Sequence, residues 1–190
     1  PNNLLFNIYD AEKENLIEFL KLNEIAVQPL YPVTSARFQR LNSKNEIDRT
    51  FNFTWMNEIP EGNEVIAGKW FENKNNGISI SSEISERYEL QVDDQIVIDI
   101  AGKKINSYIQ SIREVNWENF SPNFFAIGFP EDFKEISSTY ITSFHIPQEK
   151  KPLASELMRT FPTISYISLD TIISEVQSII SKVSQALKLI

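Results

Sequence analysis

The sequence predicts an α+β fold in which a β-rich insertion interrupts a smaller unit of strands and helices. Two observations support this prediction. Both ends of the chain alternate strand patterns with helix patterns, as β-α-β at the start and β-α-β-α at the end. The segment between them has short, aromatic, strand-like runs bounded by turns. We therefore expect residues 1–41 and 139–190 to form one discontinuous α/β subdomain, and residues 42–138 to form an inserted β-rich subdomain.

The opening unit begins with an apolar run over residues 4–9, which predicts a strand. Asp10 follows as a candidate N-cap of an amphipathic helix, because its carboxylate can accept hydrogen bonds from amides of the first turn. Residues 26–41 then predict a long strand. Pro29 and Pro32 lack amide protons, which restricts the first half of this strand to an edge or a bend.

The predicted insertion contains recognisable strands and one short helix. Residues 50–56 alternate between aromatic and polar side chains, which is typical of a half-buried strand. Ser82 is a candidate cap of a helix that continues to Leu90. Alternating isoleucines over residues 96–100 predict another strand, and a turn then leads into a partner strand over residues 105–112.

The closing unit repeats the style of the opening one. The pattern predicts strands over residues 139–146 and 164–169, with a helix over residues 153–160 that follows Pro152. Asp170 then caps a long helix with one apolar face. That face consists of Ile172, Val176, Ile179, Val183, Leu187 or Ala186, and Ile190. This spacing fits a coiled-coil seam against another helix and also fits packing on the sheet.

Composition excludes several function classes. The chain has 190 residues with 18 Lys and Arg against 26 Asp and Glu, a net charge of -8 that disfavours binding to nucleic acid. It has no Cys and one His, which disfavours metal sites and catalytic triads. No glycine-rich phosphate-binding motif is present. We therefore expect no cofactor and no enzymatic activity. The uncapped final helix leads us to expect a piece of a longer protein.

Residues 113–125 read Arg-Glu-Val-Asn-Trp-Glu-Asn-Phe-Ser-Pro-Asn-Phe-Phe. This segment resembles a signature of YbbP-type ABC transporter permeases, which reads roughly R-x-V-D/N-W-x-S/N-F-x-P-N-F-F. Further runs over residues 30–37, 66–71, 79–83 and 139–144 look like family elements in the same order. The resemblance therefore covers nearly the whole chain.

The resemblance implies an extracytoplasmic domain between the first two transmembrane helices of a permease, at the periplasmic face of the bacterial inner membrane. It implies a fold similar to the periplasmic core domain of MacB-like and LolC-like proteins of the FtsX-like superfamily, with a porter subdomain and an inserted sabre subdomain. It also implies a YbbA-like ATP-binding subunit as partner and a hydrophobic or lipid-like substrate. ATP would be hydrolysed on that separate subunit, so this domain would transmit motion without catalysing a reaction.

The same signature supplies the candidate contact residues. They are Arg113, Trp117, Phe120, Pro122, Asn123, Phe124 and Phe125. The aromatic members fit either an apolar surface for a lipid-like ligand or partner, or ordinary core packing between the subdomains. Arg113 beside Glu114 fits a residue that orients the loop, an intersubunit pair or a solvated ion pair. A second function from another class is a scaffold that docks a soluble periplasmic protein.

Overall fold

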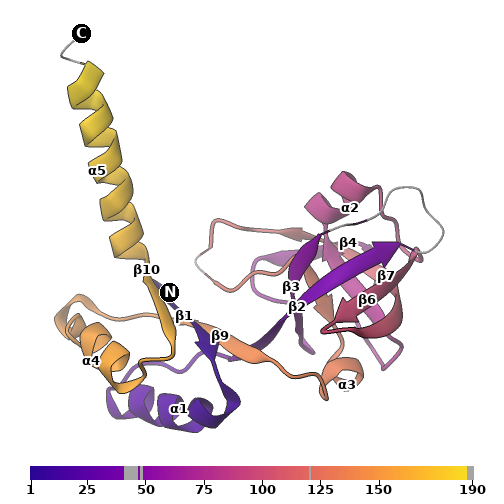
Figure 1. Ribbon diagram of the computed structural model, residues 1–190, viewed down its shortest axis with the longest axis horizontal. Coiled ribbons are helices and arrows are strands. Elements are labelled where there is room, and N and C mark those ends of the chain that lie inside the picture. The colour runs from indigo at the N-terminus through magenta and orange to yellow at the C-terminus, as the bar shows by residue number, and fades with distance from the viewer. Residues whose placement is uncertain (41–46, 48, 120, 188–190) are drawn as a thin grey trace.

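The computed structural model describes residues 1–40, 47, 49–119 and 121–187, and shows a β-rich body, a small α/β unit and a protruding helix (Figure 1). The strands are β1 (Asn3–Ile8), β2 (Tyr31–Arg40), β3 (Thr50–Trp55), β4 (Asn63–Gly68), β5 (Gly77–Ser81), β6 (Gln95–Ile100), β7 (Lys103–Val115), β8 (Ala126–Gly128), β9 (Thr139–Phe144) and β10 (Ser165–Ser168). The helices are α1 (Lys13–Leu22), α2 (Ser82–Tyr88), α3 (Pro130–Phe133), α4 (Leu153–Thr160) and α5 (Leu169–Leu187), with short 3-10 turns at Asp10–Glu12 and Gln148–Lys150. This confirms the predicted mixture of α and β structure.

The β-rich body is a closed barrel, which the sequence did not predict. Its strands pair in the cyclic order β2-β3-β8-β5-β7-β6, and β6 pairs with β2 to close the ring. The β3–β8 and β5–β7 pairs are parallel, whereas the others are antiparallel. β4 pairs with β7 outside this ring. Closure leaves the six barrel strands with no free edge among themselves.

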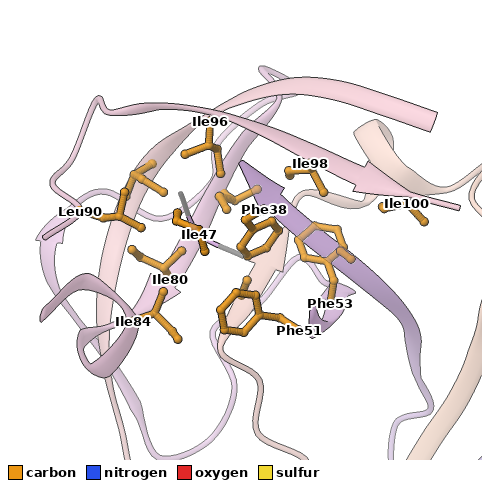
Figure 2. Close-up of a cluster of buried hydrophobic side chains, with 14 of the residues drawn as sticks. Phe38, Ile47, Phe51, Phe53, Ile80, Ile84, Leu90, Ile96, Ile98 and Ile100 are labelled. Carbon is orange, nitrogen blue, oxygen red and sulfur yellow. The ribbon is translucent and has the colours of Figure 1, made fainter. Parts of the chain in front are cut away.

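The barrel is filled by phenylalanine and isoleucine side chains, many of which Figure 2 shows. They come from alternate positions of the strands, as the alternation of a pleated strand requires. The rings of Phe38 and Phe51 stack at 5.1 Å, and Phe53 meets Phe133 edge to face at 4.8 Å. Each fully buried side chain of this size stabilises the fold by about 1.5–3 kcal/mol.

The small α/β unit consists of the sheet β10-β1-β9 with α1 and α4 packed on one face of it. Leu16 of α1 and Leu157 of α4 are buried in the same cluster as Leu5 of β1. Phe19 and Phe161 contact each other edge to face at 5.7 Å, so the two helices pack against each other as well as on the sheet.

The barrel and the small unit share one strand. The first residues of β2, Tyr31–Val33, pair with β9 of the small sheet, and its later residues, from Thr34 to Arg40, pair with β3 and β6 of the barrel. The predicted subdomain boundary at residues 41 and 42 lies outside the described residues. The barrel thus takes in residues 34–40, which the sequence pattern assigns to the first α/β segment.

Helix α5 leaves the small unit and extends away from the rest of the fold (Figure 1). With 19 residues it is about 28 Å long. Residues 170–185 are exposed, so the interpretation that this helix packs on the sheet is wrong. Asp170, the predicted cap, lies within the first turn. Within the described ranges, none of the helices has the length and hydropathy that a bilayer-spanning segment requires.

At two helix starts the N-cap residue lies one position before the residue that the sequence predicts. The amide of Tyr9 donates to Glu12 Oε2 at 3.1 Å before the first helical turn, and Asp10 instead forms an ion pair with Lys13 at 2.8 Å. Asp10 therefore lies inside the turn that it was predicted to cap.

At α2 the cap is Ser81, whose Oγ accepts a hydrogen bond from the Ile84 amide, and Ser82 is the first helical residue. The predicted strand over residues 26–41 begins only at Tyr31, after Pro29. The sequence could not place the α2 cap, because Ser81 and Ser82 are neighbouring residues of the same type and either can cap a helix.

Candidate functional site: an arginine-anchored loop at the junction

Arg113 lies near the end of β7 and is fully buried. Its Nε donates to Ser79 Oγ at 2.9 Å, and one terminal nitrogen donates to the carbonyl oxygen of Phe124 at 3.0 Å. The other terminal nitrogen donates to Asn63 Oδ1. One planar guanidinium therefore joins β5, the start of β4 and the end of the signature loop, by which we mean residues 116–125. Arginine can do this because its guanidinium carries several donors in a fixed plane.

Burial lowers the pKa of Arg113 to about 10, and the charge of Glu83 opposes that shift. The guanidinium is therefore charged at neutral pH. Among the described residues, no carboxylate forms an ion pair with it. Neutral oxygen acceptors, together with the nearby charge of Glu83, offset the cost of burying this charge. The predicted solvated ion pair with Glu114 is wrong, because Arg113 is fully buried and donates to other acceptors. Glu114 is exposed and accepts from Ser82 Oγ at 3.1 Å.

Asparagine side chains hold the loop after Arg113 against the turn before β4. Asn123 Nδ2 donates to the carbonyl oxygen of Asn116 at 3.0 Å, and Asn63 Nδ2 donates to Asn123 Oδ1 at 3.1 Å. The Asn116 amide donates to the carbonyl oxygen of Gly62 at 2.8 Å. Asn63 therefore bonds both Arg113 and Asn123, which makes arginine and loop one connected polar network.

The aromatic residues of the signature diverge. Phe124 is buried and its ring lies 6.3 Å from that of Tyr31, on the side of the small unit. Phe125 contacts Phe51 of the barrel, and Trp117 packs on Phe125 at 4.7 Å. Trp117 remains 41% exposed. The signature therefore does not gather its rings into one groove, and Phe124 and Phe125 point to different neighbours.

Trp117 is oriented by a carboxylate. Its indole Nε1 donates to Glu83 Oε1 on α2. Burial alone would raise the pKa of Glu83, but hydrogen bonds from its own backbone amide, Trp117 and Ser81, together with the charge of Arg113, lower it. Glu83 is therefore ionised at neutral pH and holds the exposed ring in a defined position. Of the remaining candidates, Pro122 is buried, Asn123 is half-buried, and Phe120 lies outside the described residues.

A third apolar cluster, which we call the junction cluster, lies where the barrel meets the small unit. Its buried members are Met56, Phe71, Phe124 and Ile127, and Tyr31, Val33, Trp70, Phe129 and Ile141 pack against them. It includes residues of β2 and β9, and so spans both parts of the fold. Sequence reasoning identified Phe124 but missed Phe71, although the adjacent aromatic pair Trp70-Phe71 was a usable signal.

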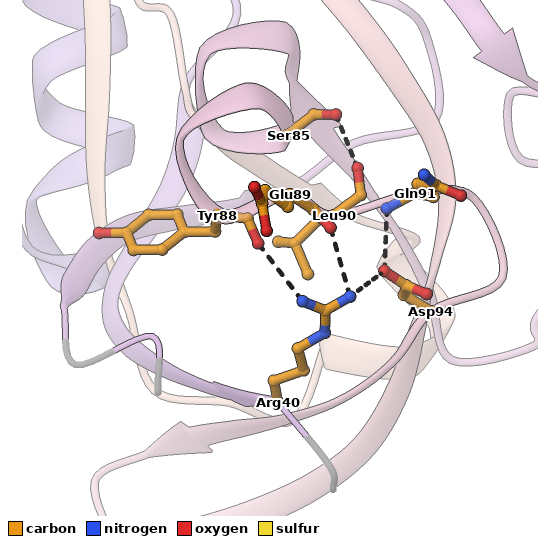
Figure 3. Close-up of polar contacts among 7 residues, drawn as sticks. All are labelled: Arg40, Ser85, Tyr88, Glu89, Leu90, Gln91 and Asp94. Atoms are coloured by element: carbon orange, nitrogen blue, oxygen red, sulfur yellow. Dashed lines mark hydrogen bonds and ion pairs between the residues drawn. The ribbon is translucent and has the colours of Figure 1, made fainter. Parts of the chain in front are cut away.

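The far end of β2 is also fixed (Figure 3). Arg40 forms an ion pair with Asp94 at 2.9 Å and donates to the carbonyl oxygens of Tyr88 and Glu89 at the end of α2. Glu89 has a φ of 52°, a left-handed conformation that ends the helix. The shared strand therefore meets the junction cluster at one end and α2 at the other. Over the described ranges, no group of three or more His, Cys, Asp or Glu residues is arranged to hold a metal ion.

Comparison with known proteins agrees with the signature. The chain is 30% identical over 184 residues to YbbP of Escherichia coli (strain K12), an uncharacterized ABC transporter permease. The chain is a homologue of one segment of this permease. The match covers 93% of the chain and 22% of YbbP, so the chain spans about a fifth of its relative. The resemblance found in the sequence is confirmed.

No protein-family model matches the chain. A crystal structure of a domain assigned to a permease protein of Porphyromonas gingivalis aligns with a TM-score of 0.43 and 13% identity, covering 86% of this chain and 87% of that domain.

Proposed function

We propose that this chain is a non-catalytic extracytoplasmic domain of an ABC transporter permease, which transmits ATP-driven motion of the membrane part to hydrophobic or lipid-like substrates. Homology to a permease supports the transporter role. In this proposal the small unit and the barrel act as the porter-like and sabre-like subdomains of a MacB-like domain. Its partner is a YbbA-like ATP-binding subunit, and its location is the periplasmic face of the inner membrane.

One structural observation carries this proposal: the start of β1 lies beside the start of α5. β1 and β10 are antiparallel neighbours with Asn3 opposite Ser168, and the Leu169 amide donates to the carbonyl oxygen of Asn2 at 2.9 Å. The chain therefore enters and leaves the folded body on one side, as Figure 1 shows for the N-terminus and the base of α5. A domain inserted between two membrane helices needs this arrangement.

The fold offers a path from α5 to the barrel. α5 continues directly from β10, β10 pairs with β1, and β1 pairs with β9. β9 pairs with β2, which is also a barrel strand, and the junction cluster packs around that crossing. α5 is joined to this path through its covalent continuation from β10. Because the strands and the junction cluster are packed together, we expect a displacement of α5 to reach the barrel through the junction.

The exposed face of α5 supplies the first test. Ile172, Ile173, Val176, Ile179, Ile180 and Val183 are each 40% to 60% exposed. An apolar stripe of this length is typical of a surface that packs against another element, and we expect other parts of the full-length permease to pack against it. The variant Val176→Ser/Ile179→Ser should leave the free energy of unfolding of the chain within about 0.5 kcal/mol of wild type, because both side chains are already exposed.

In the full-length permease with its ATP-binding subunit, the same variant should reduce transport-coupled ATP hydrolysis at least several-fold. The control Ser181→Ala/Ser184→Ala alters the polar face of the same helix and should leave coupling intact. Coupling that is equal in the two variants would contradict a role for the stripe.

A second candidate function is favoured by the exposure of Trp117. A tryptophan held in place by Glu83 and 41% exposed is typical of an anchor at a protein interface. If the domain is a docking scaffold, Trp117→Ala should abolish capture of a soluble periplasmic protein, whereas Ile66→Ala, at another exposed apolar position, should not. Capture experiments with purified, folded variants decide this, and unchanged capture by Trp117→Ala removes the alternative.

A further inference from the structure

A cavity of about 410 Å³ lies at the base of α5, between α4 and the start of β1. Its volume falls within the range of small-molecule sites. The residues that decide its chemistry are Asn3, Lys151, Ala154, Met158, Tyr166 and Asp170. None of them belongs to the junction or to the signature loop, so this cavity is separate from the site described above.

Two opposite charges line the cavity without neutralising each other. Lys151 comes just before α4, and Asp170 lies in the first turn of α5. In the part of the chain that the structure describes, neither residue takes part in an ion pair, although the neighbouring Lys150 pairs with Glu24 at 2.9 Å. The site therefore presents one free cation and one free anion to a ligand.

The rest of the lining is part polar and part apolar. The Tyr166 hydroxyl donates to Asn3 Oδ1, and Asn3 itself is buried. Burial raises the pKa of Tyr166, and the charge of Asp170 raises it further, so this hydroxyl stays protonated. Met158, 43% exposed, and Ala154 form an apolar wall on α4. Such a cavity accommodates a polar head group with an apolar chain beside it.

We propose that this cavity binds a zwitterionic amphiphile, with its anionic group at Lys151, its cationic group at Asp170 and its chain along Met158. A simple anion would face Asp170, and a simple cation would face Lys151, so each would meet repulsion as well as attraction. An adjoining groove shares Lys151 and Asp170 with the cavity and continues along α5 past Glu175. Glu175 adds negative charge near Asp170, where the cationic group of the ligand would bind. His145, the one histidine of the chain, also lines the cavity.

This inference extends the proposed function by naming a ligand class and its place. Its biological role rests on the proposed function, whereas binding itself can be measured on the chain alone. Failure to bind would leave the coupling experiments on α5 unaffected, and failure of coupling would leave binding unaffected. The two proposals are thus tested independently.

Methionine NMR provides the test. The chain has 2 methionines, so ¹³C-methyl labelling gives one signal from Met158 in the cavity and one from Met56 in the junction cluster. Titration with n-octylphosphocholine below its micelle concentration should shift Met158 and the His145 ring signal saturably and leave Met56 in place. Lys151→Ala should weaken binding about tenfold through loss of a charge-assisted contact. Ala154→Trp should block the cavity, and Lys104→Ala, an exposed barrel lysine, should bind as wild type.

Two further arms identify the ligand chemistry. Octyl glucoside has a chain without charges, and phosphocholine has the charges without a chain, so both should bind at least tenfold more weakly. Equal binding of either compound would overturn the proposal, because the charges or the chain would then contribute nothing. The absence of a saturable Met158 shift, or an equal shift of Met56, would overturn it as well.

Discussion

Replacing Arg113 with methionine should lower the free energy of unfolding by about 3–5 kcal/mol, because three oxygen acceptors around this buried position would lose their donor at about 1–3 kcal/mol each. Methionine fills much of the same space but donates no hydrogen bond. Ser79 Oγ, Asn63 Oδ1 and the carbonyl oxygen of Phe124 would each lose a donor. Urea unfolding followed by circular dichroism measures the change.

Two companion variants identify the cause of this loss. Arg113→Lys keeps the charge but loses the planar fork, so it should fall between wild type and Arg113→Met. Arg87→Met removes an exposed arginine of α2 and should change stability by less than about 0.5 kcal/mol. If Arg113→Met unfolds at the same urea concentration as Arg87→Met, Arg113 does not anchor the loop.

Gly128→Ala should destabilise the fold by about 3 kcal/mol, at the upper end of the cost of overpacking a core. A Cβ at Gly128 would lie 2.3 Å from Cε2 of Phe133 and 2.8 Å from Cζ of Phe53. These rings pack edge to face in the barrel and have little room to move. The same urea experiment measures this effect.

Gly102→Ala is the matched control. Gly102 has a φ of +85°, and a Cβ there would meet no atom within 4 Å. Only backbone strain opposes that alanine, so its cost should be about 1 kcal/mol. If Gly128→Ala lowers the free energy of unfolding no more than Gly102→Ala does, the rings of Phe133 and Phe53 can move aside at little cost.

Local patterns predicted much of the fold. The alternation over residues 50–56 gave β3, and the turn at Ala101 and Gly102 gave the β6–β7 hairpin. The helix predicted over residues 153–160 begins and ends as predicted. In each case the signal lies within one segment of the chain, where periodicity and turn chemistry act.

Closure of the barrel could not be predicted in this way. β5 is buried at all five positions although its isoleucines alternate with serines, as in a half-exposed strand, and β8 has three residues, too few for any period. Their pairing is long-range and includes parallel contacts, which no local pattern encodes. The signature identified Arg113 as a candidate contact residue, but its charge favoured an exposed position for the side chain. Only the distant acceptors Ser79 and Asn63 explain why it is buried.

We propose that α5, the small unit and the barrel form a lever that moves with ATP hydrolysis. This segment contains no Cys, so labels placed at Lys104→Cys in the barrel and Ser181→Cys on α5 would be unique within it. The distance between them can be measured by pulsed electron paramagnetic resonance in the full-length permease with its ATP-binding subunit, after any other cysteines are replaced. We predict that the distance distribution shifts between the nucleotide-free and ATP-bound states, and that Arg113→Met broadens it. A distribution that is the same in both states would contradict the account.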